Sequence, residues 1–216
     1  RVLTALWNTI IKKELFPGFT GILDGERALK WLHFWLGTST FEDLPLPAYV
    51  VAFDINQGRE CVFGPGMTPK PVEVAKAVRG SIAIPFCFHH QTIQISDTLT
   101  CGFWDGGVTS LLPLVPLIEF EKVDIIIALD ATGAADPPGT KWESIDNLSI
   151  LELAERMIKG LSDQHSATTL KLAQEHLPVH LFQVSLAASM ARPKETIKPA
   201  IDRAYEDART WLATHP

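Results

Sequence analysis

The chain is poor in several features that would place it in a common class. Its three cysteines form no Cys-x-x-Cys pair, and its 216 residues carry a net charge of −6. No apolar run reaches the roughly 18 residues of a membrane-spanning helix. The acidic balance excludes nucleic acid as a partner, because phosphate binding needs a basic surface, and it provides no polybasic segment for anionic membranes.

The cysteines, Cys61, Cys87 and Cys101, stand among mainly uncharged, apolar neighbours. Such positions are typical of reduced cysteines in the core of a protein from a reducing compartment; a disulfide or a metal site is the alternative. We therefore expect a cytoplasmic protein, one that can also associate peripherally with membranes.

The first seven residues, from Arg1 to Trp7, resemble the middle of a helix. Apolar side chains recur at three- and four-residue steps over residues 2–15, which predicts an amphipathic helix that ends at Pro17 and Gly18. The sequence therefore predicts the C-terminal portion of a longer protein.

Apolar periodicity predicts both helices and buried strands along the rest of the chain. Helices are predicted at residues 26–36 and near 72–78, as two segments between 149 and about 176, and from Pro193 to the end. Strands are predicted at residues 48–55, 61–63, 93–95, 102–104, 123–129 and 179–184. Buried strands separated by helices predict an α/β fold, a three-layer sandwich with a largely parallel central sheet, formed as one domain over residues 1–216.

The predicted helix at residues 26–36 carries apolar side chains around most of its circumference. Trp31, Phe34 and Trp35 are the largest of them. These rings belong either to the core or to a lid that faces lipid.

Asp105 is the candidate catalytic residue. Asp-Gly alone is a common turn dipeptide, but Asp105 directly follows the apolar strand segment Gly102-Phe103-Trp104. The carboxylate is therefore expected at the carboxyl end of a strand, where open α/β sheets build their sites. Gly106 and Gly107 then allow the backbone to turn sharply.

The order and spacing of motifs around Asp105 resemble those of patatin-like phospholipases, and the resemblance runs from about Phe41 to the C-terminus. The matching segments are Phe41-Glu42-Asp43-Leu44-Pro45-Leu46-Pro47, the strand at 46–55, Ala77-Val78-Arg79-Gly80-Ser81-Ile82-Ala83-Ile84-Pro85, Asp105-Gly106-Gly107, Pro113, the strand at 124–130 and Arg203-Ala204-Tyr205-Glu206-Asp207-Ala208.

The resemblance implies hydrolysis of phospholipid, lysophospholipid or other acyl esters by a Ser–Asp dyad, with no cofactor and no metal. Asp105 would accept the serine proton, and burial beneath Phe103 and Trp104 would raise its pKa. The family carries its serine in a Gly-x-Ser-x-Gly turn, and no such turn occurs in the chain. An upstream N-terminal segment or a second chain would therefore supply the serine, together with the glycine-rich oxyanion loop. The domain would then be incomplete on its N-terminal side.

The sequence departs from the family at two places near Asp105. Ser110 stands where the family often has asparagine, and the stretch from Phe86 to His90 replaces one that resembles Gly-Phe-Pro-Pro. These departures leave substrate preference open.

The other candidate nucleophiles and ligands match a catalytic pattern less well than Asp105 does. Ser39 lacks a preceding strand and is followed two positions later by Phe41 instead of glycine, which a nucleophile turn needs. Ser81 is expected at a helix end. The pair His89 and His90 is expected in a loop, either hydrogen-bonded or in contact with substrate or metal; His176 and His180 straddle Pro178 and share no helical face.

Two other hypotheses remain open. In the first, the chain is a non-catalytic lipid-binding or regulatory module on a patatin scaffold. In the second, it is an unrelated α/β enzyme in which Asp105 serves another reaction.

Overall fold

The computed structural model describes residues 21–130, 150–183 and 194–214 of the protein. The chain divides into two compact units, residues 1–107 and 108–216. The expected helix at 2–15 and the expected helix start at Pro193 lie outside the described residues. The expectation of one domain over residues 1–216 stays a prediction.

The described part of the first unit contains two helices, six strands and a 3-10 turn. In chain order these are β1 (Gly21–Leu23), α2 (Glu26–Leu36), η1 (Phe41–Asp43), β2 (Val50–Asp54), β3 (Arg59–Phe63), α3 (Val74–Ser81), β4 (Phe86–Phe88), β5 (Gln91–Gln94) and β6 (Thr100–Asp105). A second 3-10 turn, η2 (Gly106–Val108), follows β6 directly.

Four strands form an antiparallel sheet in the order β3-β2-β6-β5. Short turns join β2 to β3 and β5 to β6, and such short connections can only join antiparallel neighbours. The first turn is held by Asp54, whose Oδ1 accepts the backbone N–H groups of Asn56 and Gln57. Asn56 Oδ1 in turn accepts the N–H of Gly102 at 2.8 Å, which attaches this turn to β6.

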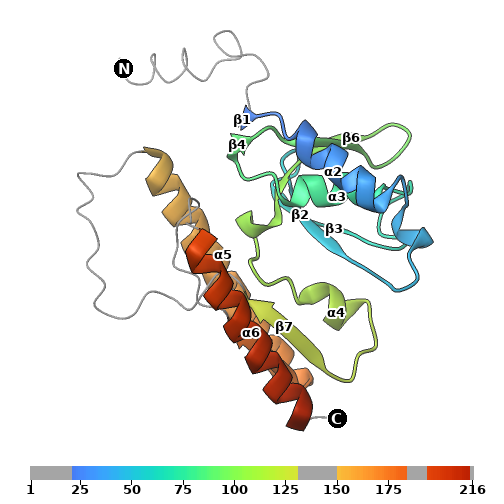
Figure 1. The fold of residues 1–216 in the computed structure, drawn as a ribbon. Helices are drawn as coiled ribbons and strands as arrows, with labels where there is room; N and C mark the ends of the chain where they lie inside the picture. The colour runs from blue at the N-terminus through green and yellow to red at the C-terminus, as the bar shows by residue number, and fades with distance from the viewer. Residues whose placement is uncertain (1–20, 131–149, 184–193, 215–216) are drawn as a thin grey trace. The chain divides into compact units, whose positions relative to one another are not determined.

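Helix α3 packs on one face of this sheet, and α2 packs against α3 (Figure 1). The core between them is apolar and fully enclosed. It is formed by Phe41, Ala52, Phe63, Val72, Val74, Ala77, Ile93, Cys101 and Phe103. At its centre the rings of Phe63 and Phe103 meet edge to face, 5.0 Å apart, a favourable aromatic geometry.

The buried guanidinium of Arg79 joins three segments of this unit. It donates hydrogen bonds to the carbonyls of Asp24 and Gly25 ahead of α2, and to that of His89 after β4. Only 2% of Arg79 is exposed, and Nη1 has no hydrogen-bond partner among the described residues. A cation removed from water in this way holds the parallel pair β1–β4 against the start of α2.

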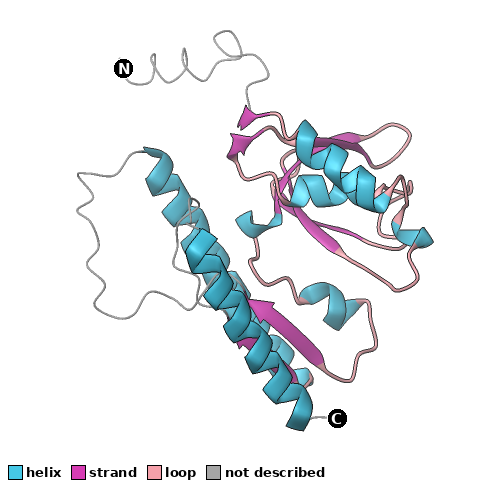
Figure 2. Cartoon of the chain, in the orientation of Figure 1, coloured by secondary structure: helices cyan, strands magenta, loops and turns pink. Residues whose placement is uncertain are grey.

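The second unit is built on the parallel strands β7 (Ile126–Asp130) and β8 (Val179–Gln183), with the short helix α4 (Val115–Glu119) before them. The long helices α5 (Ile150–His176) and α6 (Lys194–Thr214) run beside this strand pair (Figure 2). Its core contains Leu114, Ile126, Ala128 and Ala173. Trp211 of α6 packs on His180 and Phe182 of β8, and the three rings form an aromatic cluster.

The α/β class predicted from the sequence is confirmed. The parallel pairing that we expected occurs in β1–β4 and β7–β8, whereas the four-stranded sheet is antiparallel. Helix α5 is continuous from Ile150 to His176, where two helical segments were expected, and Gly160 lies inside it.

The three cysteines are unpaired, as expected. Cys101 is buried, whereas Cys61 and Cys87 are half-buried. Burial raises the pKa of the Cys61 thiol to about 11, so that it is protonated at neutral pH.

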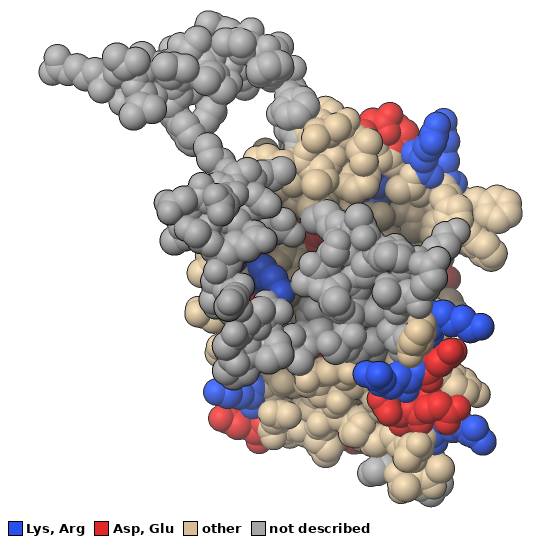
Figure 3. Space-filling view, turned by 60° about the vertical axis from the view of Figure 1, so that its left-hand side comes forward, with Lys and Arg blue, Asp and Glu red and all other residues tan. Residues whose placement is uncertain are grey.

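Charged side chains of both signs lie close together on the face shown in Figure 3. Among the described residues visible on that face, the basic groups are separated from one another and stand beside acidic ones. Within the ranges that the structure describes, no helix has the length and apolarity needed to cross a bilayer.

Gly25 and Gly58 provide a test of the role of Arg79. Both have positive φ, +72° and +66°, but a side chain at Gly25 would collide with the Arg79 guanidinium, whereas Gly58 has open space around it. Gly58→Ala should cost about 1–2 kcal/mol of unfolding free energy from backbone strain alone. Gly25→Ala should cost clearly more, because the guanidinium must leave its carbonyl partners. Urea unfolding of both variants measures the difference; equal losses would contradict the role given to Arg79.

Candidate active site

Asp105 is the last residue of β6, and the backbone fixes its position from both sides. On one side it is the register partner of Ala52 in β2. On the other side its N–H donates to the carbonyl of Ala83, just after α3, at 2.9 Å. The expectation that Asp105 ends a strand is therefore met, although this strand belongs to an antiparallel sheet.

The Asp105 carboxylate is half-buried and only partly satisfied. Oδ1 accepts the N–H of Gly107 at 2.7 Å, and Oδ2 accepts no hydrogen bond from any described residue. Burial raises the pKa of Asp105, and the hydrogen bond from Gly107 opposes this rise without cancelling it. A carboxylate with a raised pKa and an open oxygen is a stronger proton acceptor than a solvated one.

Gly106 is required by a close approach between two backbone segments. A Cβ at this position would collide with the carbonyl oxygen of Val51 in β2. Only glycine allows the chain to turn this tightly against β2 immediately after Asp105. The Gly106–Gly107 pair thus brings the Gly107 N–H back to the carboxylate.

The segment after α3 forms a tight turn beside Asp105. Cys87 N–H donates to the Ile84 carbonyl at 3.2 Å, and Pro85 and Phe86 occupy the central positions, as in a type II turn. Phe86 has φ of +67°, a conformation that favours glycine. This position lies in the stretch from Phe86 to His90, where the sequence departs from the pattern it otherwise resembles.

The Phe86 ring compensates part of this strain by packing on Trp104, with ring centroids 6.0 Å apart. Nearby, Ser81 ends α3 as expected, and its hydroxyl donates to the Val51 carbonyl at 2.7 Å. Helix α3 is therefore attached to β2 directly before the turn that holds Asp105.

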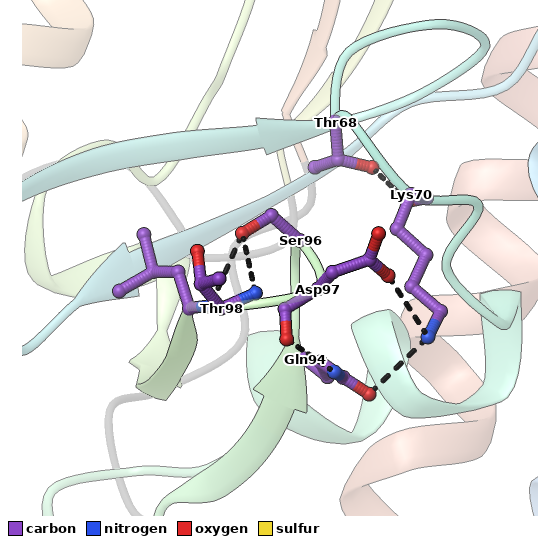
Figure 4. A network of polar contacts seen from close by, with 7 residues as sticks. Thr68, Lys70, Gln94, Ser96, Asp97 and Thr98 are labelled. Atoms are coloured by element: carbon purple, nitrogen blue, oxygen red, sulfur yellow. Dashed lines mark hydrogen bonds and ion pairs between the residues drawn. The ribbon is translucent and has the colours of Figure 1, made fainter.

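A polar network fixes the opposite end of β6 (Figure 4). Lys70 Nζ donates to Gln94 Oε1 at 3.3 Å and lies 3.9 Å from an Asp97 carboxylate oxygen. Ser96 Oγ accepts the N–H groups of Thr98 and Leu99, which closes the turn between β5 and β6. The register of β6 is thus set from its start, far from Asp105.

Ser39 and His90, the other candidate residues, lie in contacts that serve the fold. Ser39 follows α2, and its carbonyl accepts the N–H of Val74. The His90 ring lies over Gly102, and burial lowers its pKa, as do the nearby charges of His89 and Arg79.

Ser110, which departs from the family pattern, is buried in the second unit. Its hydroxyl lies 3.5 Å from that of Ser166, and Ser166 Oγ also accepts the N–H groups of Leu111 and Leu112. Ser166 therefore provides a hydrogen-bond acceptor for two backbone N–H groups that follow Ser110.

Sequence reasoning missed the structural role of Arg79 and the strain at Phe86. Arg79 appeared only as part of a motif, and nothing in the sequence indicates that it bonds to residues 54 positions away. The Pro85-Phe86 dipeptide did contain a usable signal, because proline is common at the second position of turns whose third position needs positive φ.

No protein-family model matches the chain. The chain is 29% identical over 168 residues to the uncharacterized NTE family proteins Rv1063c of Mycobacterium tuberculosis and Mb1092c of Mycobacterium bovis. The alignment covers 77% of the chain and 43% of each relative, so the chain spans less than half the length of the curated relatives it matches.

Replacing the carboxylate tests the burial of Asp105. Because burial raises its folded pKa, ionised Asp105 destabilises the folded state, and this loss develops as pH rises through the folded pKa. Asp105→Asn removes the charge and keeps an oxygen for Gly107, so it should unfold at a higher temperature than the wild type at neutral pH. The difference should vanish at acid pH, where Asp105 is protonated. Thermal unfolding across this pH range measures it, and a variant less stable at neutral pH would contradict the assignment.

Proposed function

We propose that the chain supplies the general base of a patatin-like acyl ester hydrolase that acts on phospholipids or lysophospholipids. Asp105 accepts the proton of a serine hydroxyl as that oxygen attacks the ester carbonyl, then returns the proton to the departing alkoxide. The serine and the oxyanion donors come from an upstream segment or a second chain. The observation that carries the proposal is the half-buried Asp105 carboxylate at the end of β6, whose pKa is raised by burial and whose Oδ2 accepts no hydrogen bond from a described residue.

The similarity to NTE family proteins supports this proposal at the level of the family. NTE stands for neuropathy target esterase, and the family is associated with a patatin-like phospholipase domain. The motifs around Asp105, which lie in the same sequence, resemble those of patatin-like phospholipases and support the same chemistry. The similarity does not extend to the nucleophile, because no Gly-x-Ser-x-Gly turn occurs in the chain.

Asp105→Asn should abolish ester hydrolysis while the protein stays folded. The assay uses a nitrophenyl ester, with the chain together with the segment or polypeptide that carries the serine. General-base removal should lower kcat by about 10²- to 10⁴-fold. Asp97→Asn is the matched control, since Asp97 is almost fully exposed at the β5–β6 turn and should leave kcat unchanged. Wild-type turnover that persists in Asp105→Asn would remove Asp105 from the mechanism.

The pH profile gives a second test. Asp105 acts as a base only when ionised, and burial raises its pKa. The acid limb of kcat/KM should therefore lie above the ordinary aspartate pKa of about 3.9. A limb at or below that value would contradict a buried base.

A second candidate function is a non-catalytic lipid-binding or regulatory module, which the missing serine turn favours. A serine-directed fluorophosphonate probe separates the two. Labelling of the native assembly supports the hydrolase, whereas the absence of both labelling and turnover supports the module.

A further inference from the structure

Helix α2 presents an unusual outer face. Trp31, Phe34 and Trp35 are 62%, 79% and 66% exposed. Only Leu32 among the residues of this helix is fully buried. The interpretation of the three rings as core is therefore wrong: the core-facing side of α2 is formed by its leucines, and the aromatic rings point away from α3.

The three rings form one contiguous cluster. Trp31 and Trp35 meet edge to face with centroids 6.1 Å apart, and Phe34 meets Trp35 at 5.4 Å. Water-exposed aromatic clusters of this kind cost free energy and mark surfaces that bind a partner.

Two cations share the outer face with the rings. Arg27 lies one turn before Trp31, and Lys30 lies one turn before Phe34, so each cation precedes a ring at i+4. Both are exposed, and neither forms an ion pair with a described residue. The acidic residues Asp24 and Glu26, at the start of the helix, instead interact with the buried charge of Arg79.

We propose that this aromatic and cationic face of α2 docks on the surface of an anionic phospholipid bilayer. Tryptophan is suited to the level of the lipid headgroups, since its ring is apolar and its N–H is polar. The unpaired cations would contact headgroup phosphates while the rings enter the boundary of the acyl chains. The two cations assist this contact, and the rings provide most of the affinity.

Charge distinguishes the bilayer from a second copy of the chain. A two-fold contact through this face would bring Arg27 and Lys30 close to the same residues of the partner, where like charges repel. An anionic bilayer pairs with both cations without such repulsion.

The inference does not rest on the proposed hydrolysis, because it uses no contact of Asp105. Binding can be measured without turnover, and Asp105→Asn should bind vesicles as the wild type does. A wild type that binds vesicles but shows no hydrolysis when combined with the serine-carrying segment would therefore count against the proposed function alone. A wild type that hydrolyses ester but does not bind vesicles would count against this inference alone.

The test is co-sedimentation of the full chain with vesicles of equal parts phosphatidylcholine and phosphatidylserine. Trp31→Ala should weaken binding by on the order of tenfold, through lost apolar burial. Arg27→Gln with Lys30→Gln should weaken binding to these anionic vesicles by about fivefold for each cation. The same double variant should bind vesicles of phosphatidylcholine alone as the wild type does. The control is Met157→Ala with Leu161→Ala on α5, whose side chains are similarly exposed and which should bind normally.

Three outcomes would overturn the proposal. The first is a wild type that ignores the vesicles, or variants that bind as well as it does. The second is a concentration-dependent dimer, seen by light scattering, that Trp31→Ala dissociates. The third is a Trp31→Ala variant that unfolds at a clearly lower temperature, which would show that another part of the chain covers the face.

Discussion

The geometry of Asp105 depends on the hydrogen bonding of β6 along both of its edges. On one edge β6 pairs with β2, and on the other edge it pairs with β5 up to Phe103. Beyond Phe103, the N–H of Asp105 donates to the carbonyl of Ala83 instead. A shift of one residue would exchange the two faces of the strand and expose Phe103. Burial of the Phe103 ring therefore helps the hydrogen bonds to hold Asp105 in place.

Arg79, which is buried, and Asp105, which is half-buried, are stabilised in different ways. Arg79 is surrounded by backbone carbonyls and stays charged, because each carbonyl compensates part of the lost hydration. Among the described residues Asp105 accepts a hydrogen bond only from Gly107, which does not offset the loss of hydration on burial, so burial raises its pKa. The first arrangement stabilises structure; the second leaves a group that can exchange a proton.

Much of the fold followed from local sequence signals. The bounds of α2 and the positions of β2, β3, β5 and β6 lie close to the expected ones, since apolar periodicity and turn residues determine them. The antiparallel sheet was less visible, because short strands contain no information about the direction of their partners. The sequence left the aromatic rings of α2 open between core and exposed lid for a related reason: large rings at helical spacing are typical of core, and only the fold shows that this side faces outward.

The left-handed backbone at Phe86 has a consequence for sequence variation. The conformation favours glycine at position 86, whereas the packing on Trp104 favours an aromatic ring there. Side chains of intermediate size would have the backbone strain without the ring contact. Positions 86 and 104 should accordingly covary among homologues. An aromatic residue at 86 is expected to coincide with a large ring at 104, while glycine at 86 should release 104 to accept smaller side chains.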